Sequence, residues 1–435
     1  MLHKKIQHLV FRRHHFAQSV ISIQTRQFSK QEHLEMKAMV IEEYCSEPKF
    51  VEKEIPLNAL MGGSEEPSGK QLLIKLKTSS VNPVDYKIRK GAMSMMTKLK
   101  FPATLGKDGA GIVEKVGPKV TAFKVGDEVV GFLPNNKMGS YAQYAVYEED
   151  EIVHKPKEMT FQQAVAFPLV GCTIMEMYRR HPLIGEVLDR EGKNAKDTGK
   201  ISDALEESKK PPLKILVVGA SGGTGSVAVL FAKQFLQRYF NTKVYAVCSE
   251  RNREFVTSMG ADVVIDYTKT SAKAGSETTH DKGGMSDLPS ICQTIKNEHG
   301  DAYVDIVLDC VGGYYYYDDV CKNLDCSQAK PSVVFTTIST PNPNEQTMSM
   351  STIFQVGSFL IGNKIKSISS SYPCFHMVFL GKNHNDLNLL INHVVTNNEA
   401  YKKFPLVPFS LENIKEAHLQ MESQRTVGKI VIDIQ

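Results

Sequence analysis

The sequence predicts an α/β chain with two domains, a doubly wound parallel sheet and a separate, mostly antiparallel barrel. The parallel sheet is indicated by β-branched runs that alternate with helical segments between residues 213 and 337. The barrel is indicated upstream, where short strands alternate with glycine turns, as in residues 111–117 and 126–131. With 435 residues, 42% of them hydrophobic, the chain is long enough to give each domain a full core.

The first strand of the parallel sheet ends in a glycine-rich turn that is typical of dinucleotide binding. The apolar run at residues 213–218 is followed by Gly219, Gly222 and Gly225, and a helical pattern continues over residues 226–240. Glycines let the backbone turn tightly and approach a pyrophosphate, while free N–H groups of the helix face the anion. Such turns also connect strands to helices without any ligand, so the prediction depends on the strands around it.

The end of the next strand, residues 243–248, favours NADPH over NADH. A chain that binds NAD usually places a carboxylate there for the ribose 2′-hydroxyl, whereas a 2′-phosphate needs hydroxyls and cations. Ser249, Arg251 and Arg253 suit the phosphate, and Glu250 suits the hydroxyl. The alternative is an exposed helix cap with solvated arginines.

The first 28 residues predict a mitochondrial transit peptide. They contain five basic residues and no acidic one, and apolar residues recur among them at helical spacing. Because this segment accounts for the formal net charge of +4, nothing in the rest of the chain suggests nucleic acid binding. Arg26 and Phe28 resemble a processing site that would leave Ser29 as the first residue. The alternative is a disordered basic tail.

The sequence predicts neither a membrane-spanning segment nor a cysteine-bound metal. The longest apolar candidate, residues 215–232, is interrupted by the glycine turn. The eight cysteines occur without C-x-x-C pairs, so we expect reduced thiols instead of a structural zinc or a disulfide framework.

Several further segments match one known family in the same order along the chain. They are residues 82–91, 102–111, 125–129, 139–142, the glycine turn, 260–267, 311–313 and 427–431. On these segments, residues 37–435 resemble the zinc-free quinone oxidoreductase branch of the medium-chain dehydrogenase/reductase superfamily.

The resemblance implies a GroES-like catalytic domain made from residues 37–170 and 355–435. A Rossmann NADP-binding domain, residues 171–354, would be inserted between these parts, with the active site in the cleft. The sequence agrees, because residues 411–435 predict a helix and an edge strand instead of further β-α-β units.

The resemblance also implies hydride transfer without zinc. Zinc relatives place a cysteine near position 82 and a Gly-His-Glu motif where this chain has Gly106, Lys107 and Asp108. Lysine does not replace an imidazole ligand at neutral pH, and no Cys or His stands beside Asn82. Quinones and activated enones are already electrophilic, so they suit such a site better than alcohols do.

Cofactor contacts follow from the resemblance position by position. They are Thr173, Gly219, Ser221, Gly222, Gly223, Thr224, Gly225, Ser249, Arg251, Arg253, Tyr267, Arg425, Thr426 and Val427. Thr173 would lie near the nicotinamide, and Ser249 and Tyr267 would flank the adenosine 2′-phosphate.

Asn82 is the substrate-side candidate, since the family places it beside the nicotinamide with an amide able to donate to a carbonyl oxygen. The alternative is an Asx turn before Pro83. The proton donor is unassigned, because Lys87 stands where relatives often carry a tyrosine. Asp85 and Arg89, four residues apart, are expected to form a structural pair.

Two functions remain open on the sequence. One is a mitochondrial NADPH-dependent oxidoreductase that transfers hydride to a quinone or activated enone. The other is a non-catalytic nucleotide-binding accessory or assembly subunit of an inner-membrane respiratory complex. Polar insertions at residues 179–212 and 268–285 are either solvated loops or surfaces that dock a partner, and a homodimer is compatible with both functions.

Overall fold

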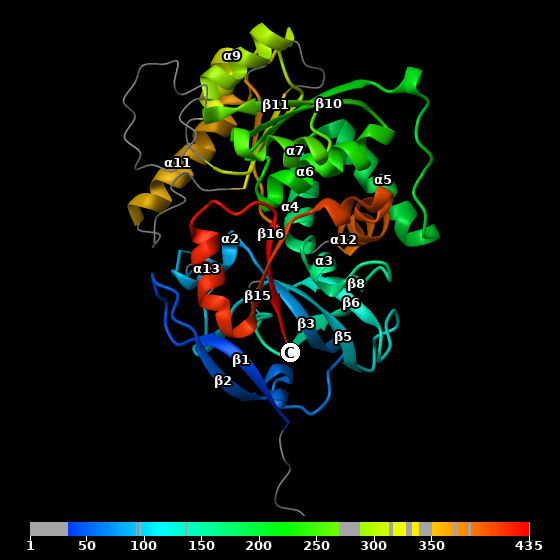
Figure 1. Ribbon diagram of the computed structural model, residues 1–435, viewed down its shortest axis with the longest axis vertical. Helices are drawn as coiled ribbons and strands as arrows, with labels where there is room; N and C mark the ends of the chain where they lie inside the picture. The colour runs from blue at the N-terminus through cyan, green and yellow to red at the C-terminus, as the bar shows by residue number, and fades with distance from the viewer. Residues whose placement is uncertain are drawn as a thin grey trace, which may run out of the picture.

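A computed structural model describes residues 34–434 of the chain, with gaps. The residues outside the description within this range are 93, 95–97, 135–136, 269–287, 313–315, 328–332, 339–349, 369–371 and 382–383. The predicted transit peptide and nearly all of the predicted insertion at residues 268–285 therefore lie outside the described residues. The described chain forms a barrel domain and a parallel-sheet domain, which are stacked along the long axis of the molecule (Figure 1).

The barrel domain is mostly antiparallel and is built from two distant parts of the chain (Figure 1). Its larger sheet has the order β15-β16-β3-β5-β6-β8 with β7 paired to β3, and its smaller sheet has the order β2-β1-β4. The strands are β1 (Glu35–Ile41), β2 (Val51–Pro56), β3 (Gln71–Val81), β4 (Ala103–Thr104), β5 (Asp108–Val116), β6 (Glu128–Phe132), β7 (Tyr144–Glu148), β8 (Ile152–His154), β15 (Leu406–Ser410) and β16 (Lys429–Asp433). The helical segments are η1 (Leu57–Met61), α2 (Pro83–Arg89), η2 (Glu149–Glu151), α3 (Phe161–Val165), η8 (Leu411–Asn413) and α13 (Ile414–Glu422).

Strand β3 organises the barrel because it pairs with β5, β7 and β16. Its register with β5 shifts between Leu76 and Thr78. A Cβ atom on Gly111 would lie 2.2 Å from the carbonyl oxygen of Lys75, so only glycine lets β5 approach β3 this closely.

The last strand corrects the sequence prediction, because β16 is not at an edge. It pairs in parallel with β15 on one side and antiparallel with β3 on the other. Its residues Lys429, Ile430, Val431 and Ile432 are at most 2% exposed. The apolar run at residues 430–432 fits an interior strand better than an edge.

The second domain contains a six-stranded parallel sheet of order β11-β10-β9-β12-β13-β14. This doubly wound order reverses direction between β9 and β12, which is where such sheets bind ligands. The strands are β9 (Pro212–Val218), β10 (Asn241–Cys248), β11 (Val263–Asp266), β12 (Ile306–Asp309), β13 (Val334–Thr337) and β14 (Cys374–Met377). The helical segments are α4 (Pro168–Arg179), α5 (Pro182–Thr198), η3 (Glu207–Lys209), α6 (Gly223–Gln234), η4 (Leu236–Arg238), η5 (Glu250–Asn252), α7 (Arg253–Ser258), α9 (Leu288–His299), α10 (Tyr316–Asn323), α11 (Met350–Lys366), α12 (His384–Leu389), η6 (Leu390–Val395) and η7 (Asn397–Lys403).

Two features of this domain differ from the sequence prediction. The parallel sheet continues to β14, beyond residue 354, where we expected the domain to end. About half of the polar insertion at residues 179–212 is helix α5, which buries Ile184 and Leu188 completely. An amphipathic helix carries its charges on the outer face and buries an apolar inner face. The charged composition of residues 179–212 therefore did not indicate the apolar inner face of α5.

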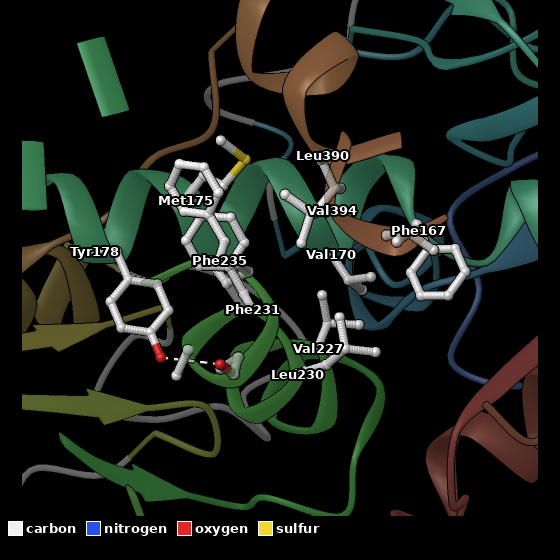
Figure 2. Packing of buried hydrophobic residues seen from close by; sticks show 14 of the residues in the cluster. Phe167, Val170, Met175, Tyr178, Val227, Leu230, Phe231, Phe235, Leu390 and Val394 are labelled. Carbon is white, nitrogen blue, oxygen red and sulfur yellow. Dashed lines mark hydrogen bonds between the residues drawn. The ribbon is translucent and has the colours of Figure 1, made fainter. Parts of the chain in front are cut away.

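One hydrophobic core runs through both domains. Helix α4 crosses between them and packs against α6 and η6 through Phe167, Val170, Leu230 and Leu390 (Figure 2). A Cβ atom on Gly171 would lie 1.9 Å from a methyl carbon of Leu390, so glycine is needed for this close packing. The shared core holds the glycine turn at a fixed place above the barrel.

Candidate functional site

The glycine turn has the shape that a dinucleotide pyrophosphate needs. Gly219 adopts a left-handed φ of 79°, and a Cβ atom on Gly225 would lie 2.2 Å from the carbonyl oxygen of Gly219. At Gly222, in contrast, the nearest atom to a Cβ would be 3.6 Å away. Gly219 and Gly225 are therefore required by the fold, whereas Gly222, at the start of α6, faces open space that suits an anion.

The C-terminal segment returns to this turn. The amide of Gly428 donates to the carbonyl oxygen of Ser221 at 3.4 Å. A Cβ atom on Gly223 would lie 3.2 Å from the carbonyl oxygen of Gly428 and 3.7 Å from Cδ of Lys429. Residues 425–427, which precede this contact, thus enter the barrel beside the dinucleotide turn.

At the end of β10 the two predicted arginines differ in their surroundings. Arg253 donates two hydrogen bonds to Glu250, at 2.8 and 2.9 Å, and a third to the carbonyl oxygen of Val264. Arg251 is exposed and forms no ion pair with any of the described residues. Asn252 donates to the hydroxyl of Ser221 at 3.0 Å, which connects this strand end to the glycine turn. Arg251 is therefore the arginine that is available to a 2′-phosphate.

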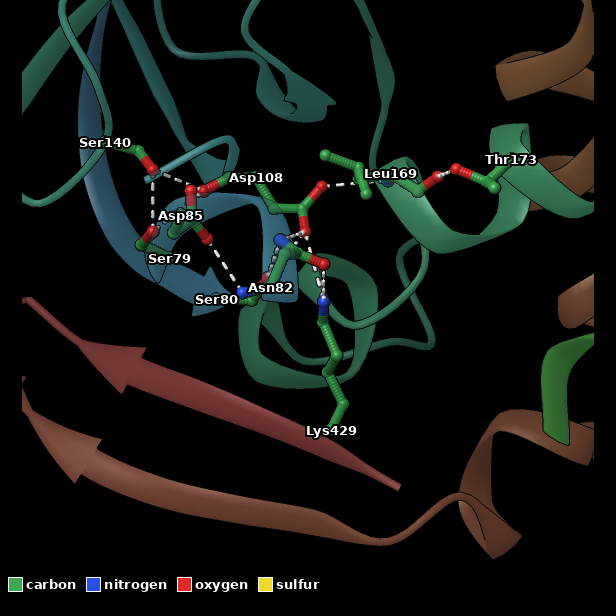
Figure 3. Close-up of polar contacts among 9 residues, drawn as sticks. All are labelled: Ser79, Ser80, Asn82, Asp85, Asp108, Ser140, Leu169, Thr173 and Lys429. Carbon is green, nitrogen blue, oxygen red and sulfur yellow. Dashed lines mark hydrogen bonds and ion pairs between the residues drawn. The ribbon is translucent and has the colours of Figure 1, made fainter. Parts of the chain in front are cut away.

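Across from the turn, the barrel presents a buried polar network of Asn82, Asp108 and Lys429 (Figure 3). The amide nitrogen of Asn82 donates to Asp108 Oδ2 at 2.8 Å. The ammonium of Lys429 donates to Asn82 Oδ1 and lies 3.4 Å from Asp108 Oδ2. All three residues are at most 2% exposed. Burial lowers the pKa of the Lys429 ammonium, and the Asp108 carboxylate opposes that shift.

Asp108 connects this network to helix α4. Its Oδ1 accepts from the amide of Leu169 at 2.8 Å, and the carbonyl oxygen of Leu169 accepts from the Thr173 hydroxyl at 2.7 Å (Figure 3). Thr173, predicted to lie near the nicotinamide, is 8% exposed. The carboxylate also accepts from Ser80 at 2.5 Å. Asp108 therefore fixes the first turn of α4 against the barrel.

The residues around Asn82 test two sequence predictions, the turn-forming role of Asn82 and the pair of Asp85 and Arg89. Its backbone amide donates to Asp85 at 2.7 Å at the start of α2, while its side chain is used in the network. The expected pair of Asp85 and Arg89 is wrong, because Arg89 pairs with Glu422 of α13 instead. Burial raises the pKa of Asp85 to about 6. Glu422 is 333 residues away in sequence, so no local spacing could indicate it.

Lys429 is the site residue that the sequence analysis missed. It lies in the quoted segment at residues 427–431, but it was assigned no role. The sequence could have marked it, since a lysine that opens a strand with a run of buried apolar residues must find a partner when that strand is buried.

The described residues contain no group of three or more His, Cys, Asp or Glu side chains that could hold a metal ion. Within the same part of the chain, no helix combines the length and the hydropathy that crossing a bilayer requires. Lys107 is 4% exposed and donates to the carbonyl oxygen of Pro134 at 3.2 Å.

Comparisons with known proteins agree with this architecture. Residues 68–157 match the alcohol dehydrogenase GroES-like domain, and residues 259–432 match the zinc-binding dehydrogenase family. A solved quinone oxidoreductase from Coxiella burnetii superposes with a TM-score of 0.61 at 21% identity, over 92% of this chain and 100% of that chain. The predicted fold class, a GroES-like domain with a Rossmann parallel sheet, is confirmed.

Curated relatives match part of the chain. The chloroplast envelope quinone oxidoreductase homolog of Arabidopsis thaliana is 38% identical over 46% of this chain and 54% of its own length. The mitochondrial NAD(P)H oxidoreductase RTN4IP1 of Homo sapiens is 34% identical over 47% of this chain and 48% of its own length. The chain thus spans about half the length of these curated relatives. With its two domain matches, its fold and these relatives, the chain belongs to the medium-chain dehydrogenase/reductase superfamily.

Proposed function

We propose that this protein is a mitochondrial NADPH-dependent oxidoreductase that transfers hydride to a quinone or activated enone without zinc. The observation that carries the proposal is the meeting of the open glycine turn at Gly222 with the buried network of Asn82, Asp108 and Lys429. Cδ of Lys429 lies against the turn, and its ammonium lies in the network. A cofactor on the turn therefore lies next to buried groups that can orient an acceptor.

The residues of the turn fit NADPH. Gly222 leaves room for the pyrophosphate, and Arg251 is free for the 2′-phosphate among the described residues. NADPH supplies the hydride when it is bound. Thr173 lies on α4, which connects the turn to the network, and so borders the place proposed for the nicotinamide.

A zinc-free site is supported by the chemistry of the donor set. Asn82 stands where zinc relatives carry a thiolate ligand, and its side-chain oxygen already accepts from the ammonium of Lys429. A metal ion beside that ammonium would be repelled by it, since the two charges would share a buried site. Lys107 offers no imidazole. Quinones and enones need no Lewis acid to become electrophilic, so they are the proposed substrates.

The relatives support the same proposal. Their printed names include quinone oxidoreductase homologues of chloroplasts and NAD(P)H oxidoreductases of mitochondria. The acidic-poor segment at residues 1–28 supports import into an organelle, and the mitochondrial relatives favour the mitochondrion, with the matrix or the matrix face of the inner membrane as the place of action.

A non-catalytic accessory subunit is the second candidate, and one observation favours it. Asn82, the substrate-side candidate, is fully buried, and both ends of its amide are hydrogen bonded within the protein. With every polar group of Asn82 used inside the protein, the site would bind a nucleotide but would offer no hydrogen-bond donor to a substrate carbonyl group.

Turnover by the purified protein separates these functions. We expect oxidation of NADPH in the presence of short-chain ubiquinone analogues, less activity with NADH, none with simple alcohols and NADP⁺, and no loss in chelator. NADPH binding without turnover of quinones or enones would favour the accessory subunit. Chelator-sensitive activity with one zinc per chain would contradict the zinc-free proposal.

A further inference from the structure

Lys429 is the least expected side chain of the candidate site. It opens β16, an interior strand of the barrel, and it is 2% exposed. Burying a lysine is costly unless its ammonium is hydrogen bonded and its charge is balanced. Asn82 and Asp108 meet both needs, although they are 347 and 321 residues away in sequence.

The contacts of Lys429 determine which way the amide of Asn82 points. An ammonium only donates, so the group that faces it must be the side-chain oxygen of Asn82. The amide nitrogen then faces Asp108, to which it donates at 2.8 Å. Without the ammonium, oxygen and nitrogen of the amide could exchange places at the cost of the bond to Asp108.

One N–H bond of Asn82 remains weakly used in this orientation. The amide nitrogen has two N–H bonds. One is directed to Asp108, and the second is directed to the Ser80 hydroxyl at 3.4 Å, which is near the limit for a hydrogen bond. Asn82 is fully buried in the protein without ligands, so a bound acceptor must displace what covers this second N–H bond before its carbonyl oxygen becomes the better partner.

We propose that Lys429 is a positioning residue for hydride transfer, which locks the amide of Asn82 so that its second N–H bond is offered to the carbonyl oxygen of the acceptor. This inference rests on the proposed function. Lys429 acts through Asn82 and transfers no proton. Its side chain also lies against the glycine turn at Gly223, which keeps Asn82 close to the proposed cofactor site.

A double-mutant cycle tests this assignment. We expect Lys429→Met and Asn82→Ala each to lower kcat with a quinone by about 100-fold or more, the range of a lost oriented donor, with the dissociation constant of NADPH within about threefold of wild type. Because both changes remove one interaction, the double variant should be no slower than Asn82→Ala alone. Lys429→Arg, which keeps a donor and a charge, should recover part of the turnover.

A matched control separates positioning from folding. Lys155 is also buried, at 7% exposure, and pairs with Glu128 on the side of the barrel formed by β6 and β8. We expect Lys155→Met to lower the melting temperature as Lys429→Met does, but to leave kcat of the folded fraction unchanged. If both variants lost turnover only in proportion to unfolded protein, the positioning role would be overturned.

The remaining outcomes distinguish this inference from the proposed function. Equal turnover in wild type and Lys429→Met would overturn the role of Lys429 alone. Additive losses in the double variant, or loss of NADPH binding in Lys429→Met, would show that Lys429 does not act through Asn82. Absence of quinone and enone turnover in the wild type would overturn the proposed function and this assignment together.

Discussion

The two sides of the candidate site are built in opposite ways. On the cofactor side, Gly222 and Arg251 are left open, and the first N–H groups of a helix such as α6 have no partner within the helix. On the barrel side, Asn82, Asp108 and Lys429 are buried and bonded to one another. A charged dinucleotide with many hydrogen bonds needs an open site, whereas the proposed quinone or enone acceptor needs one donor oriented at the carbonyl oxygen that is reduced. Each side has the form that its ligand requires.

The largest effect is expected at Gly225, where the turn is closed. Gly225→Val should destabilise the fold by about 3 kcal/mol or more, because its Cβ atom would lie 2.2 Å from the Gly219 carbonyl oxygen. Urea unfolding followed by circular dichroism measures this. A variant as stable as wild type would mean that the turn is looser than its geometry indicates.

Gly222→Val tests the open position three residues earlier. We expect the dissociation constant of NADPH to rise more than about 100-fold, because the branched side chain occupies the pyrophosphate site. The free energy of unfolding should change little, since the nearest atom to a Cβ is 3.6 Å away. Unchanged NADPH affinity, measured by titration calorimetry, would make the turn structural only and would remove the basis for the oxidoreductase proposal.

The buried side can be tested through pH. Burial raises the pKa of Asp85 from 3.8 to about 6, so the folded state binds this proton more tightly than the unfolded state. The stability contributed by Asp85 is therefore full below pH 3.8 and is lost as the pH rises through 6. Asp85→Asn should gain stability relative to wild type between pH 4 and pH 7, by about 2 kcal/mol. The exposed Asp203→Asn is the control, and an equal pH dependence in both variants would contradict burial as the cause.

The smallest effect concerns cofactor choice. Arg251→Ala should weaken NADPH binding about tenfold and NADH binding less than about twofold, since it removes one charged hydrogen bond to the 2′-phosphate. Arg253→Ala is the matched comparison, and we expect less discrimination from it because Glu250 already holds that guanidinium. Equal losses for both cofactors in Arg251→Ala would contradict the phosphate role.

The strand, glycine turn and helix of the cofactor side could be predicted from sequence because their signals are local. The glycines lie three residues apart, and the strand before them and the helix after them are continuous in the chain. The partner of Arg253 was also within reach, since Glu250 lies three residues before it on the same helical turn. The prediction that both Arg251 and Arg253 bind the 2′-phosphate did not take the pairing of Arg253 with Glu250 into account.

The barrel side could not be predicted in the same way because its contacts are remote in sequence. Asn82 meets Lys429, and Arg89 meets Glu422, only after the barrel has closed. Spacing along a helix favoured Asp85 as the partner of Arg89, but tertiary packing placed an acidic residue of α13 closer. The same closure made β16 an interior strand where its terminal position suggested an edge.

The interior position of β16 has a consequence for biogenesis. A chain that emerges from the ribosome or from a translocation pore N-terminus first exposes β3 long before β16 arrives to pair with it. Until then one edge of β3 is open, and such edges bind other unfolded chains. We therefore expect the nascent barrel to depend on chaperones until the end of synthesis, and truncations before Lys429 to aggregate although the parallel-sheet domain is complete.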